Sequence, residues 1–144
     1  MNTTLYEQDF YAWANQQAAL LRAGRLTDAD IANIAEEIES MGRSEKRELV
    51  DRLAVLLLHL LKWEFQPGLR GNSWRLTVEE QRYRLERHIA DNPSLKATLG
   101  AAMLEAYRLA LIEAERETGL ARRTFPAVCP YDYDRAMRAD FWPE

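Results

Sequence analysis

The sequence predicts an all-α fold: an antiparallel helical bundle of about four main helices, one of them long and central, followed by an extended C-terminal tail with one short helix. Apolar residues recur at three- and four-residue spacing along most of the 144 residues, whereas the alternation typical of strands is absent from the sequence. Glycine and proline separate these periodic stretches and mark the turns. This length fits one domain over residues 1–144.

The first helix is predicted from Leu5 to Ala23. Thr4 and Glu7 stand at the spacing of a capping box, and Gly24 is suited to the position just after a helix. Thr27 is then expected to cap the second helix.

The second helix is predicted to be long, from Asp28 to Glu64. The helical period that starts at Ile31 reaches Trp63 without a slip at Gly42, although glycine often ends a helix. From Leu53 to Leu61 this helix is apolar on every side, which predicts that the other helices surround it.

Two further helices and a tail complete the prediction. Ser73 or Thr77 is expected to cap the third helix, which ends at Asp91. A fourth helix is predicted from Leu95 to Thr118, and the proline-containing tail has room for a short helix from Tyr133 to Ala139.

Composition limits the class of protein. With 19 basic and 23 acidic residues, a net charge of −4 and 47% hydrophobic residues, the chain is too apolar to be disordered. Cys129 is the only cysteine, so no internal disulfide can form, and the start Met1-Asn2-Thr3-Thr4 does not resemble a signal peptide. The longest apolar run is far shorter than the roughly 20 residues of a membrane span. A cytoplasmic protein with no membrane contact is expected.

Several strings spread over the chain together point to a family. They are Tyr6–Tyr11, Ala35–Glu45, Leu56–Trp63, Ser73–Arg75, Thr124–Pro126, Cys129–Tyr131 and Asp140–Pro143. In these strings the chain resembles the bacterial family catalogued as domain of unknown function 29. The resemblance implies a small helical bacterial protein, and it brings no established activity or catalytic residues.

The two histidines do not fit the metal motif that is common in helical bundles. Di-iron helical bundles use Glu-x-x-His pairs, and neither histidine has a glutamate three residues before it. His59 with Glu36 or Glu45 is a conceivable mononuclear site, but a lone histidine among leucines favours a hydrogen-bonded core residue. The sequence therefore predicts no metal, no cofactor and no assigned catalytic residue.

A candidate buried polar site is formed by Glu37, Glu45 and His59, because both glutamates lie close to the apolar stripe of the long helix. Cys129 is interpreted as a small apolar anchor in the tail, with a nucleophile activated by histidine as the alternative. An uncharacterised enzyme that uses His59, Cys129 or the region from Glu36 to Glu45 is accordingly one of the hypotheses.

The candidate interaction surface combines aromatic residues and arginines: Trp63, Trp74, Arg75, Arg82 and Arg84. Because tryptophan and arginine are favoured anchors at interfaces, the preferred hypothesis is a non-catalytic helical module that binds an unknown protein or a second copy of itself. The alternative is a nucleic-acid-binding accessory protein that uses the same surface of the third helix. Acidic residues at three- and four-residue spacings, such as Glu79 and Glu80, predict pairing of these arginines and favour the protein partner.

Overall fold

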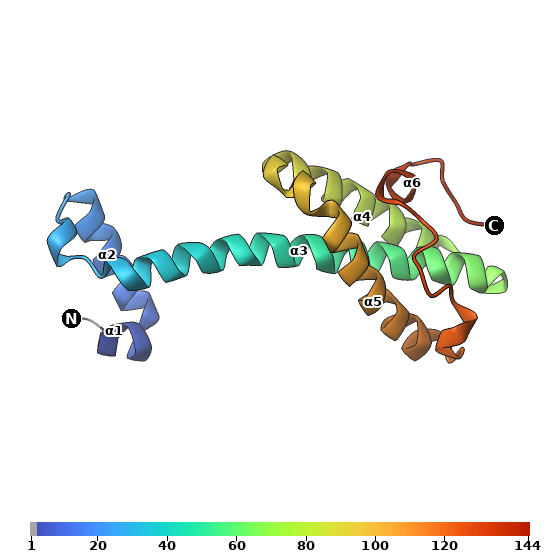
Figure 1. Cartoon of the computed structure of the whole chain (residues 1–144), viewed down its shortest axis with the longest axis horizontal. Coiled ribbons are helices and arrows are strands. Elements are labelled where there is room, and N and C mark those ends of the chain that lie inside the picture. Colours follow the sequence, from blue (N-terminus) through green and yellow to red (C-terminus); the bar gives the residue numbers. More distant parts are fainter. Residues whose placement is uncertain (1–2) are drawn as a thin grey trace. The chain divides into compact units, whose positions relative to one another are not determined.

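The computed structural model describes residues 3–144, with side chains from residue 5 onward (Figure 1). All regular structure in this part of the chain is helical, which confirms the predicted all-α class. The chain divides into two compact units, Met1–Glu45 and Lys46–Glu144. The single domain predicted over residues 1–144 therefore stays a prediction, which an unfolding experiment can test.

The first predicted helix is in fact two helices, α1 (Thr3–Gln8) and α2 (Phe10–Arg22). Asp9 interrupts them, because its side chain accepts a hydrogen bond from the amide of Ala12 at 3.1 Å and so caps α2. The side chain of Thr4, half of the predicted capping box, lies outside the described residues.

The predicted stop of α2 at Gly24 is confirmed. Gly24 has a φ of 73°, a conformation that favours glycine. Its amide donates to the carbonyl of Leu21, and the amide of Arg25 donates to that of Leu20. These two bonds are a Schellman motif, which satisfies carbonyls at the end of the helix.

Helix α3 (Ile31–Phe65) begins later than predicted. Thr27 lies in a short 3₁₀ helix, η1 (Leu26–Asp28), and does not cap α3. Asp30 takes that role, because its carboxylate accepts from the amide of Asn33 at 3.4 Å and from the Asn33 side chain at 2.8 Å. These hydrogen bonds lower the pKa of Asp30.

The predicted continuity of α3 through Gly42 is confirmed, and it has a measurable consequence. A Cβ added at Gly42 meets no atom within 4 Å, so Gly42→Ala is expected to raise the free energy of unfolding by about 0.5–1 kcal/mol. The matched control is Gly119→Ala, which is equally uncrowded but has a φ of 74°, and it should lower stability by about 1 kcal/mol. Urea denaturation of both variants tests this, and a loss of stability in Gly42→Ala would contradict a helical Gly42.

Residues 46–144 contain the remaining helices. The third and fourth predicted helices begin at other residues than the sequence predicts. Helix α4 begins after Gly71, so neither Ser73 nor Thr77 caps it: both lie inside the helix, where the Thr77 hydroxyl donates to the carbonyl of Ser73 at 2.9 Å. The predicted fourth helix is preceded by a 3₁₀ turn. The elements are η2 (Pro67–Leu69), α4 (Asn72–Asp91), η3 (Pro93–Thr98), α5 (Leu99–Thr118), η4 (Arg122–Thr124) and α6 (Tyr133–Met137).

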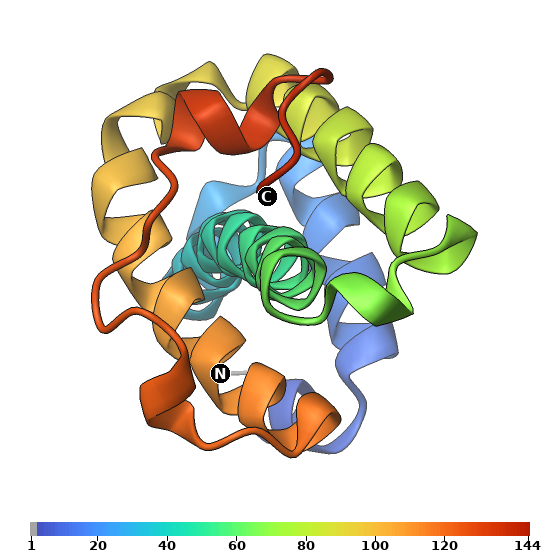
Figure 2. The ribbon, with the colours of Figure 1, turned by 90° about the vertical axis from the view of Figure 1, so that its right-hand side faces the viewer.

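The hydrophobic core of this unit is built around the second half of α3. Figure 2 looks along this helix and shows α4, α5 and the C-terminal segment around it. The apolar run from Leu53 to Leu61 supplies fully buried leucines, as its sequence predicts. Small alanines line the buried face of α5, so its backbone can approach the leucines closely. The core also includes Val78, Leu85, Phe125 and Tyr131.

Candidate functional site

Arg82, predicted to lie on an interaction surface, is instead buried and holds the C-terminal segment. Its side chain is 7% exposed. The Nε atom donates to the carbonyl of Ala136 and Nη2 donates to that of Phe141, both at 2.8 Å. The guanidinium carbon also lies 5.2 Å from the centre of the Trp142 ring. Arg82 is therefore engaged within the chain, where it holds the backbone of the C-terminal segment.

Trp63, another of the predicted surface residues, is half-buried against the same segment. Its ring centre is 4.5 Å from that of Trp142. Arg70 donates from Nε to the Trp63 carbonyl at 2.7 Å and from Nη2 to the Pro143 carbonyl at 3.3 Å. The tryptophan near the end of α3 and the terminal string of the chain therefore pack on each other.

Arg75 and Arg84 are exposed, and both pair with carboxylates of their own helix. Arg75 Nη1 lies 3.7 Å from a carboxylate oxygen of Glu79, and Arg84 Nε lies 2.7 Å from one of Glu80. The predicted pairing at four-residue spacing is thus present for these two arginines. It lowers the positive potential that α4 offers to a polyanion.

Trp74 is half-buried beside a buried lysine. Lys62 is 8% exposed, its Nζ atom lies 2.8 Å from Glu117 Oε1, and it stands 4.8 Å from the centre of the Trp74 ring. The Lys62 ammonium is therefore compensated by a carboxylate and by the face of an aromatic ring.

The three residues of the predicted buried polar site have separate surroundings. Glu37 is half-buried and accepts a hydrogen bond from the Tyr6 hydroxyl, which raises the pKa of Tyr6 to about 12. His59 is half-buried, with Nδ1 at 2.8 Å from the Val55 carbonyl, so the expected hydrogen bond is present. Glu45 is exposed. No contact described in the structure joins Glu37 to His59.

Cys129, the candidate nucleophile, lies in the tail with its thiol 3.1 Å from the Tyr131 carbonyl. Burial raises the pKa of Cys129. Since the thiolate is the nucleophilic form, these surroundings favour the structural interpretation of this residue.

His59 should make the stability of the protein depend on pH. Burial lowers its pKa, and the nearby Lys62 acts in the same direction. Below about pH 6.5 the unfolded chain binds a proton at His59 more readily than the folded chain does. The contribution of the neutral His59 to the free energy of unfolding is therefore lost as the pH falls. Unfolding free energies measured from about pH 7.5 to about pH 5.5 should fall less steeply in His59→Gln than in the wild type. Parallel profiles would show that His59 does not titrate differently on folding.

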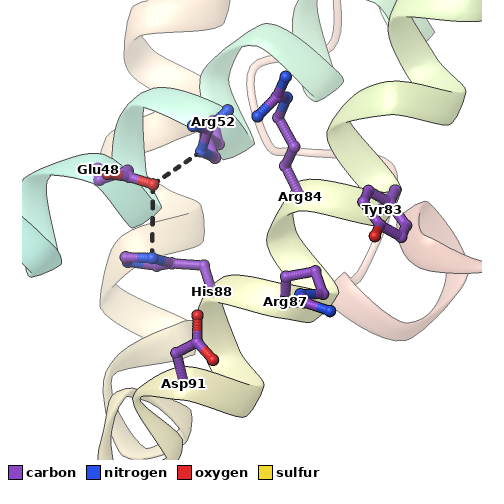
Figure 3. A pocket seen from close by; sticks show the side chains of 7 residues that line it. All are labelled: Glu48, Arg52, Tyr83, Arg84, Arg87, His88 and Asp91. Atoms are coloured by element: carbon purple, nitrogen blue, oxygen red, sulfur yellow. Dashed lines mark hydrogen bonds and ion pairs between the residues drawn. The ribbon is translucent and has the colours of Figure 1, made fainter.

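A pocket between α3 and α4 brings together charged residues that the sequence analysis did not connect (Figure 3). Its volume is about 280 Å³. Two lining residues come from α3 and five from α4. They are Glu48, Arg52, Tyr83, Arg84, Arg87, His88 and Asp91.

The inner part of this pocket is an ion-pair network centred on Glu48. His88 is 7% exposed, and its Nδ1 lies 3.5 Å from Glu48 Oε2. Arg52 donates from Nε to the same oxygen at 3.0 Å (Figure 3). The hydrogen bond from Arg52 and, to a smaller extent, the nearby His88 lower the pKa of Glu48, so this carboxylate stays ionised at neutral pH.

The outer part of the pocket carries Arg87. Its side chain is exposed, and the described part of the chain gives it no ion pair or hydrogen bond. Tyr83, 63% exposed, lies one turn before it on α4. An unengaged guanidinium beside an exposed aromatic ring can bind a carboxylate or a phosphate with two parallel hydrogen bonds.

The sequence contains a signal for this pocket in the four-residue spacing of its charged residues. Arg84 and His88 are four residues apart on α4, as are Arg87 and Asp91, while Glu48 and Arg52 have that spacing on α3. Such spacing places each pair on one helix face. Which faces meet is decided by packing across 40 residues of sequence, and periodicity along a single helix does not report that.

Comparison with known proteins supplies a family but no activity. Residues 5–142 match the model of the family described as "Domain of unknown function DUF29", so the chain belongs to that family. No curated protein and no solved structure matches the chain significantly. Within the described residues, no helix is both long and apolar enough to cross a membrane.

Proposed function

We propose that this member of the DUF29 family is a non-catalytic protein-interaction module of the bacterial cytoplasm, which binds an acidic segment of a partner protein in the pocket between α3 and α4. The observation that carries the proposal is Arg87, an exposed guanidinium without a partner among the described residues, at the edge of a pocket. The nearby Tyr83 provides the kind of anchor that interfaces favour.

The charges of the pocket fit a single carboxylate better than a nucleic acid. Three arginines line it, but Glu48 and Asp91 oppose them, and Arg84 is engaged by Glu80. A polyanion needs a row of free cations, whereas one aspartate or glutamate side chain needs one guanidinium. The paired state of Arg75 also argues against a phosphate-binding track along α4.

The buried part of the pocket fixes its shape and leaves Arg87 to make the contact. Glu48 holds Arg52 and His88 in place, since both nitrogens lie within 3.5 Å of one carboxylate oxygen. A prearranged site loses less side-chain entropy when a partner binds, which favours affinity. Glu48, Arg52 and His88 thus support the shape of the pocket, and Arg87 at its edge contacts the partner.

Affinity capture of native lysate on the immobilised full chain, followed by mass spectrometry, tests the proposal. Arg87→Glu is expected to reduce capture of the partner at least about tenfold, because it places like charges in contact. Arg123→Glu is the matched control, since Arg123 is also exposed and has no described partner but lies outside the pocket, in η4. Equal capture by wild type and Arg87→Glu would overturn the proposal.

The nucleic-acid alternative gives a different result in the same experiment. Captured RNA or DNA, released steeply between about 0.05 and 0.2 M salt, would replace the protein-binding proposal. Titration of labelled single- and double-stranded nucleic acid over that range confirms or removes this alternative. We expect no binding tighter than the nonspecific range of about 10⁻⁴–10⁻⁶ M.

A further inference from the structure

Helix α5 has a second face that the core does not use. One face is buried by small residues, among them Ala102, Ala106 and Ala110. On another side, six exposed or partly exposed residues line a surface groove along the helix, and we call them the outer stripe. They are Ala101, Leu104, Glu105, Arg108, Leu109 and Ile112. Leu104 is 71% exposed, and with Leu109 and Ile112, each 39% exposed, it forms an apolar patch along the helix.

The outer stripe also contains two charges without partners. Neither Glu105 nor Arg108 makes an ion pair or hydrogen bond with any described residue. Elsewhere on α5, Glu113 pairs with Arg116, and Glu115 pairs with Arg122 at 2.9 Å. Opposite charges without partners, placed between exposed leucines, suit a surface that provides the complementary charges.

The order of residues in the outer stripe is symmetric about a point on α5 between Ala106 and Tyr107. Leu104 and Leu109 are equally far from this point on its two sides. Glu105 and Arg108 are equally far from it as well, with opposite charges, and Ala101 and Ile112 form the outermost apolar pair. A helix with this order is complementary to itself when a second copy runs antiparallel across it.

We propose that the outer stripe binds the outer stripe of a second copy of this chain about a two-fold axis that passes between Ala106 and Tyr107. In this arrangement Glu105 faces Arg108 of the partner subunit, and the reciprocal pair forms at the same time, as two-fold symmetry requires. Leu104 packs on Leu109 of the partner subunit. The interface covers four apolar side chains of each chain and pairs both of the stripe's charges.

The mirrored order of the two charges favours a second copy of this chain as the partner of the outer stripe. An unrelated amphipathic helix also covers leucines, but it has no reason to match a glutamate and an arginine in mirrored positions. A contact between two helices of this length is small for a specific interface, so we expect a reversible dimer with a dissociation constant in the micromolar range. This inference does not rest on the pocket between α3 and α4 or on the function proposed for it.

Sedimentation equilibrium of the full chain, from about 1 to about 200 μM, tests the proposal over the expected range. The wild type should shift from monomer to dimer. Leu104→Glu should keep the chain monomeric at all these concentrations, because it buries a carboxylate against leucine. Leu76→Glu is the matched control: Leu76 is 51% exposed on α4, outside the stripe, and the variant should dimerise as the wild type does.

A charge-exchange cycle then tests the register. Glu105→Arg and Arg108→Glu should each weaken dimerisation at least about tenfold, since each opposes like charges across the axis. The double variant should return to within about threefold of the wild type, because the exchange restores both pairs with their signs reversed. Circular dichroism checks that every variant keeps its helix content.

Three results would overturn the inference. These are a wild-type chain that stays monomeric, a dimer that Leu104→Glu does not affect, and a double variant that dimerises no better than the single ones. The last result removes the antiparallel pairing even if the chain dimerises.

Discussion

Arg82→Ala is expected to lower the free energy of unfolding by about 3 kcal/mol or more, because hydrogen bonds of a charged donor contribute about 1.5–3 kcal/mol each and are not fully additive. The change removes the donors that hold the carbonyls of Ala136 and Phe141 at 2.8 Å. Ala136 is fully buried, so water cannot simply replace the lost donor. The ring contact with Trp142 is lost as well.

The expected loss is specific to the geometry of the guanidinium. Arg84→Ala, on the same helix, removes an exposed ion pair with Glu80 and should change stability by no more than about 0.5 kcal/mol. Arg82→Lys keeps the charge but not the planar set of donors, so its loss of unfolding free energy should lie between those of Arg82→Ala and Arg84→Ala. Urea denaturation gives the free energies, and hydrogen exchange should locate the loss in residues 136–143. If Arg82→Ala cost no more than Arg84→Ala, Arg82 would not be holding the tail.

The fold was largely predictable from the sequence because its signals are local. The phase of the apolar residues predicts a continuous α3 through Gly42, and Gly24 predicts a helix end that the structure confirms by a positive φ. The start positions were harder. Asp9 caps a helix that starts inside the predicted first helix, and Asp30 caps α3 in place of Thr27, because several polar residues compete to cap each helix and tertiary contacts decide among them. Asp30 also accepts from the Trp13 indole at 3.2 Å.

The candidate site was less predictable because its residues come from distant parts of the chain. Arg82 looked like a surface cation, since its burial depends on carbonyls that lie more than 50 residues later. His88 has no glutamate three residues before it on its own helix, whereas its partner Glu48 lies on α3. Composition and spacing identify which residue types are available. They do not identify which helix faces meet.

Leu57→Ala is the second change with a large expected effect. Leu57 is fully buried in the second half of α3 and belongs to the core cluster. Removing most of its side chain loses the transfer free energy of the buried atoms and leaves a cavity, so the free energy of unfolding should fall by about 2–5 kcal/mol. Leu76→Ala, at a 51% exposed leucine of α4, should change it by about 0.5 kcal/mol or less.

The same variant tests the predicted single domain. If residues 1–144 unfold as one cooperative unit, Leu57→Ala should reduce the hydrogen-exchange protection of α2 and of α5 by the same free energy, although Leu57 belongs only to the unit formed by Lys46–Glu144. If the two units unfold separately, the variant should reduce protection in α5 and leave α2, with its buried Trp13, unchanged. Unequal losses would therefore replace the single-domain prediction with two folding units, because a cooperative domain transmits the whole cost of a core cavity to each of its helices.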